Sequence, residues 1–151
     1  LPPMAMTPDA ARAIEAMTAD DLATAQFAQL AAVSTLATWS PDPTDPGILK
    51  VDTGLQPDGT IDPLVNQRLA ANSPLVLLPQ YLPALNGLEA FAMDIGDANF
   101  LLEGNAQFRA ELGRFGVQYQ FELYEGDHGN RIAERIRSHV LPFFAQHLDT
   151  E

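Results

Sequence analysis

The sequence predicts an α/β fold with a parallel sheet, and three observations lead to this class. Two strand-like runs, 88–95 and 117–124, are each followed by a run with helical spacing. The first run is almost continuously apolar, which is typical of a strand covered on both faces. The segment between the runs is long enough for the helix that joins parallel strands. We therefore divide the chain into a helical, proline-broken part, 1–86, and a strand–helix–strand–helix part, 87–151.

The chain is expected to begin with two alanine-rich helices. Thr7 suits the cap of the first helix and Pro8 its first position, and this helix should extend to about Met17. The second helix should begin at Thr18, with two aspartates in its first turn, and extend to about Thr38. Alanine favours helix formation but buries little apolar surface.

Prolines and glycines dominate the next segment, 39–63, which is predicted to be a long ordered loop. A helix over about 62–71 should follow it. The segment 74–85 has helical character as well, but Pro79 and Pro83 are expected to break it up.

In the last third, the apolar spacing within 100–115 predicts a helix, and Gly116 stands where a C-terminal cap belongs. The second strand, 117–124, alternates apolar and polar residues, which indicates the edge of a sheet. Asn130 is expected to cap a final helix with an apolar stripe. The stripe consists of Ile132, Ile136, Val140 and Phe143.

Two strands do not make a stable doubly wound sheet by themselves. The chain also starts at Leu1 rather than at a methionine. We therefore expect further strands from an N-terminal half that precedes Leu1. The compartment, cytoplasmic or secreted in a bacterium, stays open, because any targeting signal would lie in that half too. The alternative is a chain that completes its sheet by self-association.

The composition excludes several classes of function. The net charge is −12, from 20 acidic and eight basic residues, so nucleic acid and anionic membranes are not expected partners. The absence of cysteine excludes disulfides, thiolate zinc sites and a thiol nucleophile. No apolar run approaches the roughly 20 residues of a membrane span. The acidity is interpreted as a solubility feature.

Two turns carry the chemistry, 94–101 and 124–129, and each follows a predicted strand. The ends of neighbouring parallel strands meet at one edge of a sheet, where α/β proteins build their active sites. His128 is the candidate base, because the glycines around it allow a sharp turn that leaves the imidazole accessible. The alternative is an exposed loop histidine without a role.

A carboxylate near His128 would orient the imidazole and stabilise its protonated form. Asp94 and Asp97 are candidates, although each could instead shape its turn through hydrogen bonds. Asp127 is interpreted as bracing the histidine loop, because neighbouring side chains of an extended segment point apart. His139 and His147 lie on the final helix, where packing or the helix C-terminus explains them.

The motifs in this part of the chain carry a resemblance to a known family. They are 94–97 (DIGD), 100–105 (FLLEGN), 124–129 (YEGDHG) and 141–144 (LPFF). Residues 1–148 resemble the C-terminal portion of an α/β-hydrolase, from the esterase group that includes esterase D, S-formylglutathione hydrolase and the mycolyltransferase-like enzymes. In this fold the triad follows the order serine, acid, histidine along the chain.

The resemblance implies a serine-type hydrolase of carboxylic esters or thioesters, with no metal or organic cofactor and with His128 as general base. The acid of the family usually stands three residues after the strand-end glycine, Gly96, and that position holds Asn99. We prefer Asp97 slightly over Asn99 as the orienting residue. Residues 1–86 would form a helical insertion over the site.

The chain departs from the family in a second respect, because it contains no Gly-x-Ser-x-Gly motif. Its serines are Ser34, Ser40, Ser73 and Ser138. None has the glycine-flanked context of a strained nucleophile, so the chain is expected to hold the acid-and-histidine half of a triad. The alternative is a catalytically inactive relative that binds a small ligand or a partner protein, which the asparagine at the acid position favours.

Overall fold

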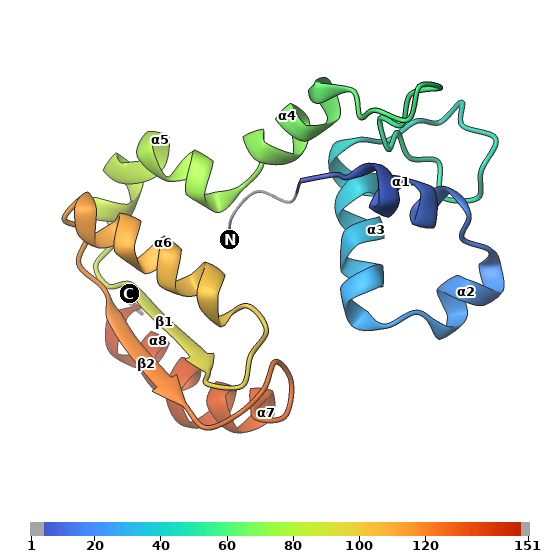
Figure 1. The fold of residues 1–151 in the computed structure, drawn as a ribbon. Helices are drawn as coiled ribbons and strands as arrows, with labels where there is room; N and C mark the ends of the chain where they lie inside the picture. The colour runs from blue at the N-terminus through green and yellow to red at the C-terminus, as the bar shows by residue number, and fades with distance from the viewer. Residues whose placement is uncertain (1–4, 149–151) are drawn as a thin grey trace. The chain divides into compact units, whose positions relative to one another are not determined.

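The computed structural model describes residues 5–148 and divides the chain into two units. The first unit ends at Leu77, and the second begins at Leu78. The division falls inside one helix, α5 (Pro74–Asn86), which contributes residues to both units (Figure 1).

Four helices form the first unit: α1 (Pro8–Glu15), α2 (Ala19–Thr24), α3 (Phe27–Trp39) and α4 (Pro63–Ala71). The first helix is capped as predicted, since the Thr7 hydroxyl accepts from the amide of Ala10.

The single helix expected from Thr18 to Thr38 is wrong, because the structure breaks it into α2 and α3. Ala25 is extended, with a ψ of 142°, so the backbone cannot continue the helix there. A new start follows immediately, where the Gln29 side chain accepts from the amide of Gln26 at 2.9 Å. This local hydrogen bond gives the Gln26 amide, at the start of α3, the acceptor that it would otherwise lack.

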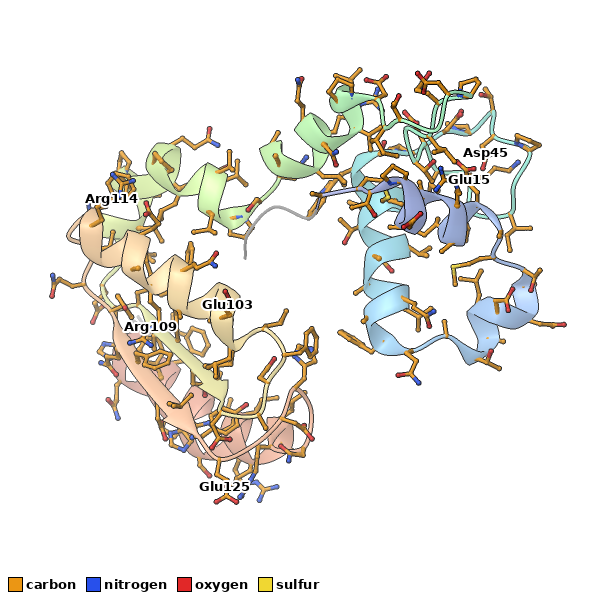
Figure 2. The ribbon with its side chains drawn as sticks, viewed as in Figure 1. Glu15, Asp45, Glu103, Arg109, Arg114 and Glu125 are labelled. Carbon is orange, nitrogen blue, oxygen red and sulfur yellow. The ribbon has the colours of Figure 1, made fainter. Side chains whose placement is uncertain are left out.

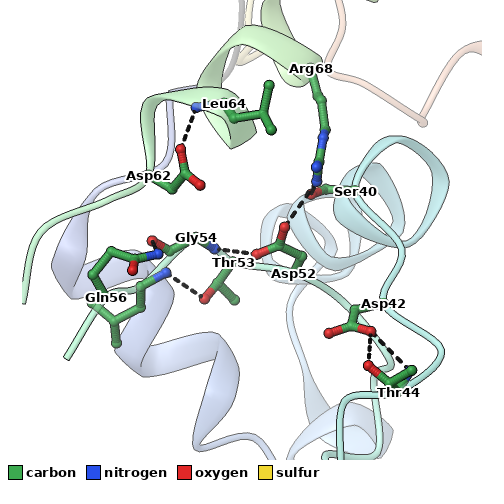
Figure 3. Close-up of polar contacts among 11 residues, drawn as sticks. Ser40, Asp42, Thr44, Asp52, Thr53, Gly54, Gln56, Asp62, Leu64 and Arg68 are labelled. Carbon is green, nitrogen blue, oxygen red and sulfur yellow. Dashed lines mark hydrogen bonds and ion pairs between the residues drawn. The ribbon is translucent and has the colours of Figure 1, made fainter.

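The loop between α3 and α4 is ordered by short polar contacts (Figure 3). The Arg68 guanidinium of α4 binds the Asp52 carboxylate at 2.9 Å and the Ser40 hydroxyl at 3.2 Å. The Asp42 carboxylate accepts from both the amide and the hydroxyl of Thr44, which is an Asx turn. Beneath these contacts lies a core. It comprises Met6, Ala11, Ile14, Leu36, Val51, Val65 and Leu69.

The helix α5 is continuous, so the expectation that its prolines break it up is wrong. Pro79 and Pro83 both lie inside it. An interior proline removes a hydrogen bond and costs about 3 kcal/mol. Packing of Leu78, Leu82 and Leu85 into the core of the second unit offsets that cost.

The second unit contains a two-stranded parallel sheet, which confirms mixed α/β character. The strand β1 (Ala92–Gly96) pairs with β2 (Gln120–Tyr124), and α6 (Leu102–Arg114) connects them. Both strands are shorter than predicted. Gly116 has a φ of +70°, which only glycine adopts readily. It follows the C-cap residue of α6, Phe115, and stops the helix there, as expected.

The two faces of the sheet carry different residues. Met93 packs on the core beneath α6, and its register partner Phe121 lies under the Arg109 guanidinium at 3.3 Å. Asp94 and its partner Glu122 lie on the opposite face and bind Arg135 of the final helix. The sheet therefore has one helix on each face (Figure 1).

The final helix has three segments: α7 (Ile132–Arg135), a π-helical stretch (Ile136–Val140) and α8 (Leu141–His147). Pro142 explains the wide middle turn, because it has no amide hydrogen to complete the α-helical ladder.

The expected start and burial of this helix both need correction. Asn130 does not cap it, because the Asn130 side chain accepts instead from the Asp127 amide at 3.0 Å. The predicted apolar stripe lies in solvent over much of its length, since Ile132 is 53% exposed and Ile136 is 46% exposed. Across residues 5–148, no helix has the length and apolar character needed to cross a membrane.

Candidate functional site

The ends of β1 and β2 bring the two predicted loops together. Beyond Gly96, the Asp97 amide donates to the Tyr124 carbonyl at 2.8 Å, and the Ala98 amide donates to the Gly126 carbonyl at 2.9 Å. These bonds extend the register of the sheet into the loops. They hold the turn after β1 against the turn after β2.

The close approach of the loops requires glycine at Gly96. A β-carbon there would lie 2.1 Å from the Gly126 carbonyl oxygen, far inside van der Waals contact. Glycine at position 96 therefore allows the two backbones to meet, which places residues 97–99 beside residues 126–128.

The structure brings His128 to Asn99. The Nδ1 atom of His128 lies 3.4 Å from the Oδ1 atom of Asn99, a long hydrogen bond. The same Oδ1 atom accepts from the Leu101 amide at 2.9 Å, which fixes the orientation of the side-chain amide. Because Oδ1 is an acceptor, the contact requires a proton on Nδ1 of His128. The lone pair of a neutral ring is then on Nε2, where it can accept a proton.

Phe100 is a neighbour of the histidine that the sequence did not single out. Its ring centroid lies 4.8 Å from that of His128, with the planes inclined by 44°. Such tilted stacking limits how far the imidazole can turn. Phe100 is also 59% exposed, an unusual position for a phenylalanine. The sequence signal for this contact was an aromatic residue, Phe100, directly after Asn99.

The two loop aspartates brace the backbone. The Asp97 carboxylate accepts from the Gly126 amide at 3.1 Å, which ties one loop to the other. The Asp127 carboxylate accepts from the amides of Gly129 and Asn130, both at 2.8 Å. The hydrogen bond from the Gly129 amide, followed by that from the Asn130 amide, holds the pKa of Asp127 below its usual value. Asp127 thus occupies the bracing position assigned to it from sequence.

A second cluster lies on the face of the sheet that the final helix covers, where Arg135 is nearly buried. Its guanidinium binds Asp94 at 2.8 Å and Glu122 at 2.7 Å, and it lies 2.9 Å from Nε2 of His139. Hydrogen bonding to Glu122 is the main reason that the pKa of Arg135 is raised, and Arg135 lowers the pKa of Glu122. Asp94 therefore belongs to this cluster, not to the loop site.

Arg135 was not predicted, because the sequence alone does not show that Asp94 and Glu122 lie opposite each other. Two carboxylates at matched positions of neighbouring strands repel each other, and a cation over them relieves this repulsion. Arg135 and His139 are one helical turn apart, which aligns both with those carboxylates. A groove of about 580 Å³ opens beside this cluster, lined also by Phe143 of α8.

His147, the remaining histidine, lies 3.7 Å from the Glu89 carboxylate and against the Phe143 ring. This is a packing position, remote in sequence from the two loops. Among residues 5–148, no group of three or more His, Cys, Asp or Glu side chains is arranged to hold a metal ion.

Comparison with known proteins adds no family. No model of a protein family matches the chain, and no curated protein matches it either.

Proposed function

We propose that this chain provides the histidine base and its orienting residue for a serine-type hydrolase of carboxylic esters or thioesters. The observation that carries the proposal is the contact between His128 Nδ1 and Asn99 Oδ1, 3.4 Å apart, at the C-terminal edge of two adjacent parallel strands. The nucleophilic serine would come from polypeptide outside these 151 residues.

In this mechanism, Nε2 of His128 takes the proton of the serine hydroxyl as the oxygen attacks the ester carbonyl. The protonated ring then gives this proton to the leaving alcohol or thiol. Asn99 keeps the proton on Nδ1, so the lone pair of the neutral ring is on Nε2, the atom that acts as the base. Because an amide is neutral, Asn99 stabilises the imidazolium less than a carboxylate does, and an aspartate-to-asparagine change in a serine protease triad lowers turnover about 10⁴-fold.

The geometry favours Asn99 over Asp97 as the orienting residue, which reverses the slight preference drawn from the sequence. Asp97 directs its carboxylate to the Gly126 amide, where it serves the loop backbone. Asn99 instead reaches the imidazole ring.

The arrangement of the second unit supports an α/β-hydrolase as the parent fold. β1, α6 and β2 form a parallel crossover unit, the final helix covers the other face, and the orienting residue precedes the histidine along the chain. Further strands would complete the sheet, from an N-terminal half of the same protein or from a second copy of the chain. A small-molecule ester is the expected partner.

The neutral side chain of Asn99 favours a second candidate function. A relative that has lost catalysis could keep the same loops to bind a small ligand or a partner protein. In that case the histidine would contact the ligand but would not transfer protons.

The protein expressed from its complete reading frame tests the proposal. We expect it to hydrolyse p-nitrophenyl acetate and to react with a fluorophosphonate probe, with the label on a serine outside the 151 residues. His128→Ala should lower kcat by at least about 10³-fold, whereas the matched control His147→Ala should retain activity.

Activity that His128→Ala leaves unchanged would contradict the proposal. Ligand binding without any turnover would support the inactive relative instead.

A further inference from the structure

One turn brings two consecutive side chains to the same imidazole ring. Asn99 and Phe100 lie between β1 and α6, and both contact His128. Their turn comes shortly before Glu103, which is labelled on α6 in Figure 2. The Asn99 amide donates to the Gly96 carbonyl at 3.1 Å, which holds the turn against the end of β1. Both contacts to the ring therefore come from one fixed segment.

The two contacts restrain different motions of the ring. Asn99 Oδ1 reaches a single atom, His128 Nδ1, at 3.4 Å, and one long hydrogen bond lets the ring tilt about that atom. Phe100 instead lies against the ring as a whole, with the centroids 4.8 Å apart and the planes inclined by 44°. This separation is within the range of favourable aromatic pairs. The stacking therefore restrains the tilt that the hydrogen bond leaves open.

The stacking also provides an attraction for positive charge that the amide of Asn99 lacks. In the proposed mechanism His128 becomes an imidazolium, which a neutral amide stabilises only weakly. An aromatic ring attracts a cation within about 6 Å of its centroid, and the two centroids lie 4.8 Å apart. The charge of the neighbouring Asp127 also interacts with that of His128, and Phe100 adds to this attraction.

We infer that Phe100 is a positioning residue of the candidate site, which holds the His128 ring towards Asn99 and stabilises the imidazolium. The inference rests on the proposed function and adds a residue to it. The role requires no contact between Phe100 and the substrate. Loss of the aromatic ring should therefore lower kcat and leave KM nearly unchanged, and another aromatic side chain should restore kcat.

Phe100→Leu and Phe100→Tyr test this in the protein expressed from its complete reading frame. Phe100 is exposed, so both variants are expected to fold, and thermal unfolding checks this. Loss of the cation–π attraction should lower kcat for p-nitrophenyl acetate about two- to fivefold. Looser orientation of the base should bring the total for Phe100→Leu to about tenfold, with KM changed less than about twofold. Phe100→Tyr should keep kcat within about twofold of the wild type.

Phe144→Leu is the matched control. Phe144 is also an exposed phenylalanine of the second unit, but its ring packs against Phe143 of the same helix, with centroids 5.6 Å apart. The same chemical change at this position should leave kcat at the wild-type value.

The tautomer of His128 provides a readout that a general loss of stability would not move. Long-range ¹⁵N–¹H correlation spectra should show less of the Nδ1–H form in Phe100→Leu than in the wild type or in Phe100→Tyr. The reason is that a ring free to tilt no longer keeps Nδ1 on the Asn99 oxygen.

Wild-type kcat together with wild-type spectra in Phe100→Leu would overturn the inference and leave the proposed function intact. A rise in KM at unchanged kcat would overturn it as well, because Phe100 would then bind the substrate. The absence of any His128-dependent hydrolysis would overturn the proposed function, and the spectra would still show whether Phe100 orients the ring.

Discussion

At the scale of single residues, one amide oxygen sets the chemistry of the candidate base. Asn99 Oδ1 accepts from the Leu101 amide and lies 3.4 Å from His128 Nδ1. The backbone bond prevents the amide from turning over, so an oxygen, never an NH₂ group, faces the ring. The orienting role therefore depends on a helix-start turn as much as on the side chain itself.

We predict that neutral His128 carries its proton on Nδ1. Asn99→Ala should shift the population towards the Nε2–H form, because the acceptor that holds the Nδ1 proton is lost. Asn99→Asp should keep the Nδ1–H form. Long-range ¹⁵N–¹H correlation spectra, recorded well above the titration range of imidazole, distinguish the two forms directly. Identical spectra for Asn99→Ala and the wild type would contradict the assignment.

We also predict that Gly96→Ala is among the most damaging single substitutions in the second unit. The added carbon would lie 2.1 Å from the Gly126 oxygen, so the loops must separate, at a cost on the order of 3 kcal/mol in unfolding free energy. Gly113→Ala is the matched control, since nothing lies within 4 Å of its added carbon. It lies inside α6 and should stabilise by roughly 0.5–1 kcal/mol. Urea unfolding measures both values.

At the scale of elements, Arg135 connects the final helix to both strands. Asp94 and Glu122 are register partners, so the guanidinium neutralises two carboxylates that would otherwise repel each other. The apolar stripe of the same helix is largely exposed. The contacts of Arg135 are therefore the main interactions that hold the first turn of this helix on the sheet.

Arg135→Met should therefore destabilise the second unit. Removing one partner of a buried ion pair costs about 3–5 kcal/mol. The Asp94 and Glu122 side chains are 34% and 49% exposed, so solvent screens them and we expect roughly 1–3 kcal/mol. Arg137→Met, on the neighbouring π-helical stretch, makes the same chemical change away from these carboxylates. Comparable losses for the two variants would contradict a specific role of Arg135.

The same cluster predicts a pH dependence. Hydrogen bonding to Arg135 lowers the pKa of Glu122 below its usual 4.5. A lowered pKa means that the folded state favours the ionised form. This stabilisation is complete above about pH 4.5 and is lost as the pH falls through the lower pKa of the folded state. Glu122→Gln should flatten the acid limb of the stability curve, measured by urea unfolding between about pH 3 and 6. If the unfolding free energy of Glu122→Gln falls with decreasing pH as steeply as that of the wild type, this prediction is wrong.

At the scale of the whole molecule, a two-stranded parallel sheet is marginal without further strands. The second unit also exposes large apolar side chains: Phe100 on a loop, Leu123 on β2, and Leu141 and Phe144 on α8.

We therefore expect the isolated 151-residue chain to hydrolyse p-nitrophenyl acetate no faster than a denatured control. The physical reason is that a histidine oriented by a neutral amide needs a serine nucleophile, and the serines of this chain have no glycine-flanked turn. Size-exclusion chromatography with light scattering should accompany the assay, because self-association would add strands to the sheet without supplying the serine. Robust turnover by this chain alone would refute the proposal.

Local signals in the sequence were sufficient for much of the chain. The Thr7 cap, the turn at Gly116 and the two strands depend on short-range hydrogen bonds and side-chain periodicity. All of them appear, although both strands are shorter than predicted. The failures are informative. Ala25 breaks a helix that its alanine-rich sequence favours, and α5 keeps two prolines because packing outweighs their local cost.

By itself, the sequence determined that two turns, one acidic and one with a histidine, follow two strands that pair in parallel. Pairing places those turns at one edge whatever the details of packing. Only the tertiary structure decided which polar side chain meets the ring. Asp97 and Asn99 are two residues apart in the same loop, yet Asp97 binds a backbone amide and Asn99 contacts the imidazole. It likewise decided that Arg135 lies over Asp94 and Glu122, since that contact depends on strand register and helix placement together.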